Sequence, residues 1–303
     1  MRELVGNGHT SLAVHTVTEA LDGLDAIHAD LATVGAVLLR GLPADLDLFD
    51  RVVRTVGGEP LEYTERSTPR SEVQGNIYTS TEYPAAQSIP MHNENSYSDT
   101  WPGRLFFVCH TAAETGGATP IADSRAMLRR IPQAVRDRFA DGVVYTRAFQ
   151  EDLGLSWQEA FQTQERTVVE EYCGRHGQQF EWTDYGLRTR HHRPATQKEP
   201  VTGEDVWFNQ ANLFHVSSLD AEVSEMLQEL YAVEDLPRHA TLADGSPITA
   251  ADLDAIREAY DEVSLALPWR VGDVMVVNNM LVAHGRQPFT GERRILVAMT
   301  AAP

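Results

Sequence analysis

The chain has 303 residues, of which 42% are hydrophobic, and a formal net charge of -19 at pH 7. This length allows one large domain with a buried core, and the strong negative charge argues against nucleic acid or an anionic membrane surface as a partner. The chain has only two cysteines, Cys109 and Cys173, so we expect no disulfide framework. It has neither a membrane-spanning apolar run nor the apolar core of a signal peptide, so we expect a cytoplasmic protein.

The N-terminal part, about residues 1–60, has an α/β pattern. Apolar residues recur at helical spacing over 16–35, an apolar strand follows at 35–42, and a second helix is expected over 45–58. The first helix contains His28 and Asp30, one of two His-x-acid triplets in the chain. Positions i and i+2 of a helix point about 200° apart, so this pair cannot hold one ion and a solvated helix face is expected.

From about residue 75 to residue 122 the pattern changes to short β-rich segments punctuated by proline and glycine. Residues 124–176 are expected to be mainly helical, with Thr163 as the N-cap of a helix that stops at Gly174 or Gly177. Farther along, strands alternate with two amphipathic helices, and the second helix opens with Thr249 and Asp252, close to a capping box. The expected strands are 75–83, 104–112, 118–123, 179–182, 187–194, 205–214, 272–284 and 293–302, and the two helices are 219–233 and 250–265.

Strands in the middle and at the end of the chain, separated by helices, indicate one sheet closed from distant segments. We therefore expect an α+β fold with a mainly β core, a jelly-roll (double-stranded β-helix) barrel with N-terminal helices and helical insertions, in one domain over residues 1–303. No G-x-G-x-x-G turn is present, which disfavours a doubly wound sheet. The insertion at about 150–190 could be a lid or an ordinary covering layer, and a second, helical insertion is expected at about 218–266.

The second triplet, His92 and Glu94, lies in the β-rich region after Pro90. In an extended strand, residues i and i+2 face the same side about 6.6–7 Å apart, so both side chains can converge on one cation. An imidazole with a carboxylate suits Fe, Zn, Mn or Co. A third ligand must come from elsewhere. Among the other histidines His284 stands out, because it ends an apolar strand and is followed by glycine and, ten residues on, by paired arginines; the alternatives are His110, His176, His191, His192, His215 and His239.

Residues 92–125 ("HNENSYSDTWPG…") and 284–299 ("HGRQPFTGERRILVAM") resemble the taurine dioxygenase/TfdA family of iron(II)- and 2-oxoglutarate-dependent oxygenases. The stretches "LGLSWQEAFQT", "VEEYC" and "VWFNQANLFH" further resemble its branch of SyrP-like hydroxylases from bacterial natural-product pathways. The resemblance covers nearly everything from about residue 35 to the end.

The resemblance implies an iron site made by His92, Glu94 and His284, and implies O₂ and 2-oxoglutarate as cosubstrates. It further implies that Thr119 and Arg294 bind 2-oxoglutarate. Strand alternation places Arg294 on the face with Leu296, Ala298 and Thr300, and Arg293 on the face with Ile295, Val297 and Met299. The face with smaller residues leaves more room for a ligand, although alternation alone does not decide which face looks inward.

The family chemistry implies hydroxylation or desaturation of an aliphatic carbon, in a small amino-acid-like substrate. Glu94 speaks against a halogenase, because members with that activity lack the carboxylate. Ala298 stands where taurine dioxygenase has a basic residue for the sulfonate, four positions after its cosubstrate arginine, which argues against taurine. Asn76, Tyr78 and Ser88 are candidate substrate contacts, with a surface role as the alternative.

Three alternatives stay open. The substrate could be tethered to a carrier protein, although a chain with a net charge of -19 would repel a carrier, which is usually acidic, and this favours a free substrate. The same ligands could hold zinc in a hydrolase or lyase, or the chain could be a metal-free binding protein. Thr119 and Arg294 discriminate, because a zinc enzyme needs no 2-oxoglutarate pocket.

Overall fold

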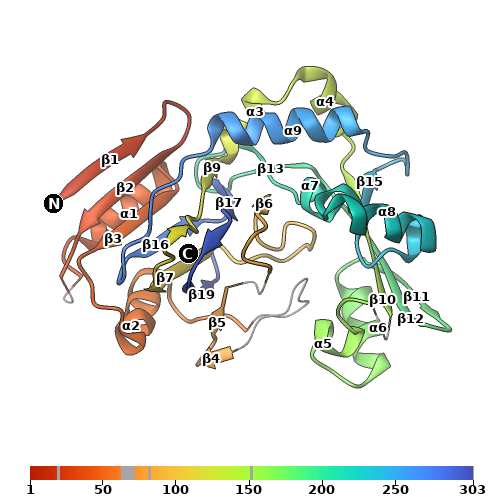
Figure 1. Ribbon diagram of the computed structural model, residues 1–303, viewed down its shortest axis with the longest axis horizontal. Helices are drawn as coiled ribbons and strands as arrows, with labels where there is room; N and C mark the ends of the chain where they lie inside the picture. The colour runs from red at the N-terminus through yellow and green to blue at the C-terminus, as the bar shows by residue number, and fades with distance from the viewer. Residues whose placement is uncertain (19–20, 63–71, 81–82, 151–152, 303) are drawn as a thin grey trace.

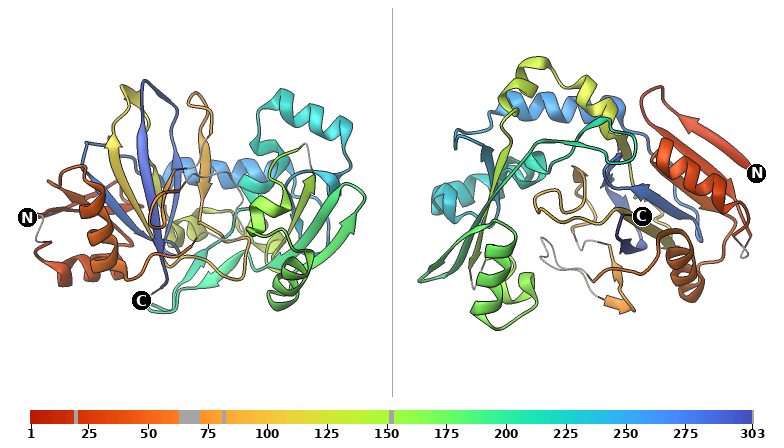
Figure 2. Two further views of the ribbon diagram at one scale, coloured as in Figure 1. Left: turned by 90° about the horizontal axis from the view of Figure 1, so that it is seen from below. Right: turned by 180° about the vertical axis from the view of Figure 1, so that it is seen from behind.

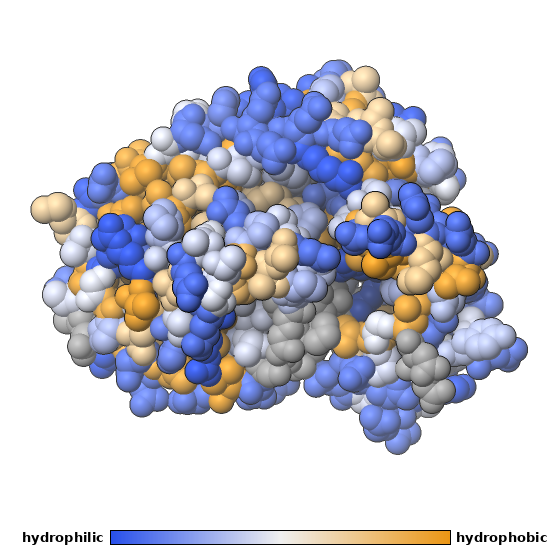
Figure 3. Space-filling model, in the orientation of Figure 1, coloured by the Kyte–Doolittle hydropathy of each residue, from blue (hydrophilic) through white to orange (hydrophobic). Residues whose placement is uncertain are grey.

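The structure is a computed structural model that describes residues 1–18, 21–62, 72–80, 83–150 and 153–302. A mainly β part carries the N-terminus and the C-terminal strands, and a smaller four-stranded sheet with its own helices lies beside it (Figure 1). Helix α9 (Ala250–Val263) runs across the top of both parts, and the two views of Figure 2 show the same separation. Figure 3 shows hydrophilic residues over the upper face and a hollow between the two parts.

The largest sheet has eight strands in the described chain, and its order brings distant segments together. Neighbouring strands are antiparallel except β2 and β3, which are parallel. In sheet order the strands are β1 (Arg2–Gly6), β2 (Ser11–Thr16), β3 (Ala36–Arg40), β16 (Val274–Asn278), β7 (Arg104–Thr111), β19 (Arg294–Thr300), β5 (Ile77–Thr79) and β4 (Glu72–Gln74).

A second, three-stranded sheet packs against one face of this large sheet. It contains β6 (Ile89–His92), β17 (Val282–Arg286) and β9 (Ile121–Asp123), and the two-stranded ribbon of β8 (Thr115–Gly116) and β18 (Phe289–Thr290) stands beside it. The two sheets share a core that joins Ile295 and Val297 of β19 to Ile121 and Val282. Over the described residues the strands form separate open sheets and not the closed barrel that the sequence led us to expect, because no strand of the small sheet pairs with the large one.

Helices cover the other face of the large sheet. Leu296 and Ala298 pack there with helix α2 (Leu46–Gly57) and helix α1 (Leu24–Thr33). The expected helix over 45–58 is therefore confirmed, and Asp45 caps it by accepting a hydrogen bond from the Leu48 amide at 2.8 Å. The helix expected over 16–35 is shorter than predicted, and residues 19–20 lie outside the described part.

The four-stranded sheet forms the second part of the molecule. Its order is β11 (Gln179–Thr183), β12 (Gly186–Arg193), β10 (Val143–Gln150) and β15 (His239–Leu242). Around it and across the top lie the remaining elements: α3 (Ser124–Arg130), α4 (Gln133–Arg138), α5 (Trp157–Phe161), α6 (Arg166–Arg175), β13 (Thr196–Lys198), β14 (Asp205–Trp207), α7 (Ala211–Phe214), η1 (Val216–Ser218), α8 (Ala221–Leu230) and η2 (Val233–Asp235).

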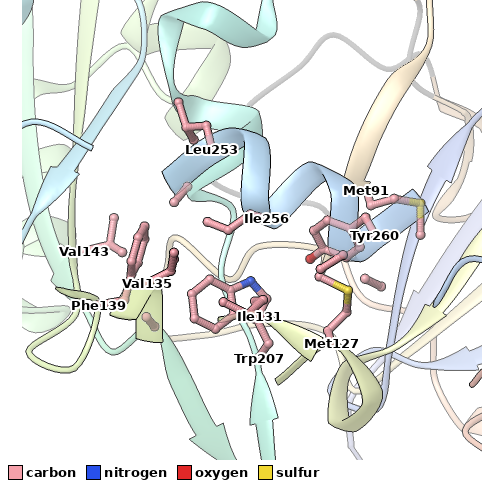
Figure 4. Close-up of a cluster of buried hydrophobic side chains, with 14 of the residues drawn as sticks. Met91, Met127, Ile131, Val135, Phe139, Val143, Trp207, Leu253, Ile256 and Tyr260 are labelled. Atoms are coloured by element: carbon pink, nitrogen blue, oxygen red, sulfur yellow. The ribbon is translucent and has the colours of Figure 1, made fainter. Parts of the chain in front are cut away.

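A continuous core joins this part to α9. Figure 4 shows Ile256 and Tyr260 of α9 pointing toward Trp207 and Met127, which come from β14 and α3. All four side chains are at most 3% exposed. The capping box predicted at Thr249 and Asp252 is confirmed at the start of α9, which fixes where this helix begins.

Several expected elements are wrong. Residues 143–150 belong to a segment predicted as mainly helical, yet they form β10, whose β-branched and aromatic residues pair with β12 and β15. The strand expected over 205–214 ends at Trp207, and α7 follows it. Helix α6 has Glu165 and not Thr163 as its N-cap, and the strand expected over 272–284 is two strands separated by a turn. The strand expected over 75–83 is only β5, and residues 81–82 lie outside the described part.

The first His-x-acid triplet has a structural role. His28 is exposed, as expected, but the prediction of a solvated position is wrong for Asp30. Asp30 accepts two hydrogen bonds of 2.7 Å from Arg2, and its Oδ2 lies 2.7 Å from Nε2 of His15. Arg2 chiefly holds the pKa of Asp30 below its usual value. Asp30 therefore anchors the first two strands to α1 through Arg2 and His15.

No helix in the described residues is long and apolar enough to cross a membrane.

Candidate active site

Two neighbouring strands bring the three predicted ligands together. Strands β6 and β17 are antiparallel, and His92 lies directly opposite His284 in their register. Glu94 follows β6 by two residues, so that its Oε2 lies 4.0 Å from Nε2 of His92 and 3.8 Å from Nε2 of His284. One ligand atom from each residue lies within 4.8 Å of the others, and all three residues are buried. Two imidazoles and a carboxylate on one side are a donor set suited to non-haem iron(II).

Backbone contacts orient this set. Nδ1 of His92 lies 2.8 Å from the Pro90 carbonyl, which assigns the proton to Nδ1 and leaves Nε2 as the atom directed at Glu94. Gly285 follows His284, and a Cβ there would come within 2.7 Å of the Ile89 carbonyl and 2.9 Å of the Met91 sulfur. Glycine is therefore needed at this position for β17 to lie this close to β6.

Asn279 is a site residue that the sequence analysis missed. Its Oδ1 accepts a hydrogen bond of 2.8 Å from the Glu94 amide, and its Nδ2 donates to the carbonyls of Glu94 and Pro102, both at 2.9 Å. Its own carbonyl accepts from the Asn93 side chain at 2.7 Å. Asn279 is fully buried. The sequence feature that could have pointed to Asn279 is the pair of asparagines that interrupts the apolar run of residues 272–284.

A narrow pocket opens beside the two histidines. Apolar walls from Phe107, Ile295 and Val297 face a polar end formed by Thr119, Arg293 and Arg286; Ser80, Ile89 and Gly285 complete the lining. Arg293 donates to the Gly117 carbonyl at 2.8 Å and to Oγ1 of Thr119 at 3.4 Å. Thr119 also accepts from the Trp269 indole at 3.1 Å. The polar end therefore presents a hydroxyl and two guanidinium groups to the pocket.

The charge of Arg293 has no acidic partner among the described residues. Burial, together with the nearby positive charge of Arg286, lowers the pKa of Arg293 to about 10. The guanidinium of Arg286 is held by the carbonyls of Tyr83, Pro84 and Gln87 at 2.6–2.9 Å. A partly buried cation that has no acidic partner among the described residues and lies next to a metal-ligand set fits the carboxylate of a chelating cosubstrate.

The position of Arg294 corrects the sequence analysis. Arg294 is exposed at the start of β19 and does not line the pocket, whereas Arg293 does. The predicted inward face was wrong, because the smaller residues Leu296 and Ala298 pack against α2 while Ile295 and Val297 face the site. The size of the side chains on each face of β19 did not identify the face toward the pocket, because helix α2 fills the space against the face with the smaller residues.

The candidate substrate contacts are not brought into this pocket. Tyr78 is 2% exposed and packs in the core shared by the two sheets, and its hydroxyl donates to Oδ1 of Asn76 at 3.2 Å. Asn76 lies in the turn between β4 and β5 with a φ of 63°. Ser88 is exposed directly before β6, while its neighbour Ile89 lines the pocket.

Comparisons with known proteins agree on one family. The family model "Taurine catabolism dioxygenase TauD, TfdA family" matches residues 6–300. The chain is 40% identical over 307 residues to the dapdiamide synthesis protein DdaC of Enterobacter agglomerans, covering 99% of this chain and 93% of that protein. It is 31% identical over 278 residues to a clavaminate synthase-like protein of Arabidopsis thaliana, covering 88% and 81%.

Among solved structures, the fold is similar to that of PvcB from Pseudomonas aeruginosa, with a TM-score of 0.58, 14% identity, and coverage of 99% of this chain and 91% of that one. A second PvcB structure has a TM-score of 0.57 and 15% identity, and that protein is described as an Fe, α-ketoglutarate-dependent oxygenase from an isonitrile synthetic pathway. At this identity the likeness concerns the fold.

Proposed function

The chain belongs to the TauD/TfdA family of dioxygenases, and from that premise we propose that it hydroxylates or desaturates an aliphatic carbon of an amino acid or amino-acid derivative in a biosynthetic pathway. Its cofactors are iron(II) and 2-oxoglutarate, with O₂ as the oxidant. One observation carries the proposal: His92, Glu94 and His284 converge beside a pocket whose polar end holds Arg293, partly buried and without an acidic partner among the described residues. A metal-ligand set and a carboxylate site are thus adjacent.

Each residue has a role in this proposal. His92, Glu94 and His284 hold the iron, and Asn279 holds the Glu94 backbone in place. Arg293 and Thr119 bind the far carboxylate of 2-oxoglutarate in place of the hydroxyl contact they now share. When bound, iron and 2-oxoglutarate supply the activation of O₂ that oxidises the substrate, with succinate and CO₂ as coproducts. Phe107, Ile295 and Val297 line the pocket with apolar surface and keep water from it.

Taurine is a poor candidate for the substrate. In taurine dioxygenase the residue that holds the sulfonate lies four positions after the arginine that binds the cosubstrate. If Arg293 is the cosubstrate arginine of this chain, the corresponding position is Val297 and not Ala298. Val297 lines the pocket and is apolar, so it offers no cation to a sulfonate. The biosynthetic role rests on the relative at 40% identity, whose name assigns it to dapdiamide synthesis.

A zinc hydrolase or lyase would use the same three ligands but has no use for the buried arginine of this pocket. The test is aerobic incubation with iron(II), ascorbate, 2-oxoglutarate and a panel of amino acids, free and carrier-bound, with succinate and product mass as readouts. A product that gains one oxygen atom, matched by succinate, supports hydroxylation, and loss of two hydrogens supports desaturation. Conversion that needs no 2-oxoglutarate, or a chlorinated product, would overturn the proposal.

A further inference from the structure

A second cavity, outside the metal pocket, contains two arginines. Arg147 of β10 and Arg238, which directly precedes β15, both line a cavity of about 360 Å³. The rest of its wall is mainly apolar and includes Phe149, Leu153, Leu155, Phe214, Leu227 and Leu236. The cavity therefore combines two guanidinium groups with apolar surface, which is the lining expected for an organic anion.

The state of Arg238 distinguishes this cavity from an ordinary structural ion-pair site. Arg238 is partly buried, yet it makes no hydrogen bond or ion pair to any described residue, whereas many other arginines of the chain do. Burial lowers its pKa, and the positive charge of Arg147 lowers it further. Arg147 is itself only 5% exposed. Two like charges in one partly dehydrated cavity repel each other, and a bound anion would relieve that cost.

Contacts connect the arginine pair to the metal site. The guanidinium of Arg147 lies 4.5 Å from the centre of the Phe149 ring and 5.6 Å from that of Tyr97, which is three residues after Glu94. Arg238 interacts electrostatically with Tyr83, and the Tyr83 carbonyl accepts a hydrogen bond of 2.9 Å from Arg286 of the metal pocket. The pair thus lies between the apolar cavity and the segments that carry the metal ligands.

We propose that Arg147 and Arg238 together bind an oxyanion of the substrate while its apolar part occupies the adjoining cavity. This inference rests on the proposed oxygenase function and specifies the substrate class of that site. Two sources present this chemistry: the carboxylate of a free substrate, and the phosphate of the arm that tethers a substrate to a carrier protein. A planar guanidinium pairs with either group through two hydrogen bonds.

Equilibrium binding to the full chain, kept free of metal and 2-oxoglutarate, tests this without turnover. Calorimetric titrations would compare hexanoate with hexanamide, and pantetheine 4'-phosphate with pantetheine, so that each anion has a neutral counterpart. We expect at least one anion to bind tenfold or more tightly than its counterpart. Preference for hexanoate identifies a free carboxylate as the source, and preference for the phosphate identifies the carrier arm. The inference would be overturned if each anion bound with the same affinity as its own neutral counterpart.

Variants locate the binding. Arg238→Gln should weaken the preferred anion at least tenfold and leave its neutral counterpart unchanged, and Arg147→Lys should weaken it less. Arg190→Gln is the matched control, because Arg190 is exposed on the neighbouring strand β12, opposite Thr146. Arg293→Gln reports separately on binding in the metal pocket, whose arginine also fits a carboxylate, and should lower the anion affinity less than tenfold if Arg147 and Arg238 form the main site. Wild-type affinity in Arg238→Gln, or a tenfold loss in Arg293→Gln, would contradict the assignment.

The same variants separate this inference from the proposed function. Arg238→Gln should still form the iron(II)–2-oxoglutarate chelate under anaerobic conditions, seen by its visible absorption. If the wild type forms no chelate but loses anion affinity on Arg238→Gln, the oxygenase proposal fails and the anion site stands. If the chelate forms and Arg238→Gln binds the anion normally, only the anion site fails.

Discussion

At the level of single residues, strand pairing brings two of the three proposed metal ligands together. His92 and His284 are cross-strand neighbours, and neighbouring side chains on one face of a sheet lie about 4.5–5.5 Å apart at Cβ. The period of a strand led us to expect His92 and Glu94 on one face of a strand, but β6 ends at His92 and Glu94 lies in the turn that follows it. Its position at the end of an apolar strand, before glycine and the paired arginines, made His284 the favoured third ligand, and the family resemblance implied the same set; its register opposite His92 is a property of the folded sheet that no local pattern shows.

Removing one ligand tests the metal site. His284→Ala should weaken iron(II) binding at least tenfold, because two ligands hold the ion less firmly than three. Equilibrium dialysis under anaerobic conditions, followed by metal analysis, measures the change. His28→Ala is the matched control, since His28 is exposed on α1. Retention of wild-type iron affinity in His284→Ala would show that the assigned set is not the metal site.

The two adjacent arginines give a paired prediction. Arg293→Gln removes a partly buried, charge-assisted partner of a carboxylate, which costs about 2–5 kcal/mol, so the 2-oxoglutarate concentration needed for half-saturation should rise at least tenfold. Arg294→Gln changes an exposed side chain and should have little effect. Succinate formation at varied 2-oxoglutarate measures both. A larger effect of Arg294→Gln would mean that the inner face of β19 has been assigned wrongly.

Asn279 is predicted to act as a positioning residue. Asn279→Ala leaves the Glu94 amide and carbonyl without their partners, and iron(II) affinity should fall about 10–100-fold. Asn278→Ala is the control, because the Asn278 side chain accepts from the Met280 amide in the same turn without touching Glu94. A purely structural role would lower the melting temperature of both variants and leave the iron affinity of both unchanged.

At the level of secondary-structure elements, local patterns predicted elements that end in clear caps. The helix expected over 45–58 is present, and the helix at Thr249 begins where its predicted capping box indicated. Strand β10 was missed because its stability comes from pairing with β12 and β15, which are distant in the sequence. The N-terminal hairpin of β1 and β2 was missed too, although it extends the largest sheet. Pairing between distant segments overrides local preference at both places.

The β10–β15 pair carries a pH-dependent contribution to stability. Burial lowers the pKa of His239 from its usual 6.5 to about 4, and the ring of His215 lies 4.7 Å away. The unfolded chain therefore takes up this proton as the pH falls through 6.5, while the folded chain resists until about pH 4. The free energy of unfolding should fall over this interval by up to about 3 kcal/mol from this group.

His239→Gln should remove that contribution. Compared with the wild type, the variant should lose less stability between about pH 7 and about pH 4.5, as measured by chemical denaturation at both pH values. Parallel losses in the two proteins would show that His239 does not sense pH through the folded state.

At the level of the whole molecule, the metal pocket lies in the mainly β part, and the arginine cavity is lined by residues of the second part, from β10, α7, η1, α8 and the segments beside them. Segments from about residue 80 to residue 297 supply the two sites, so we propose that the chain works as one domain. The sequence predicted the β character and the family, but not the open sheets or the cavity, because both depend on how distant elements pack.

The net charge of -19 sets the context for substrate choice. Against this background an anionic substrate is repelled at long range, and the two arginines of the cavity offer local compensation at the site. The choice between a free acid and a carrier-bound arm therefore depends on Arg147 and Arg238, which belong to the second part of the molecule.

The metal-ligand set and Arg293 are proposed to form one oxygenase site. The most direct test is to titrate the full chain anaerobically with iron(II) and 2-oxoglutarate and to follow the visible absorption. We expect a chelate band that saturates at one equivalent of iron, is lost in His284→Ala and needs at least tenfold more 2-oxoglutarate in Arg293→Gln, while Arg294→Gln behaves as the wild type. A wild-type protein that forms no such band, or a band that survives in His284→Ala, would refute this assignment.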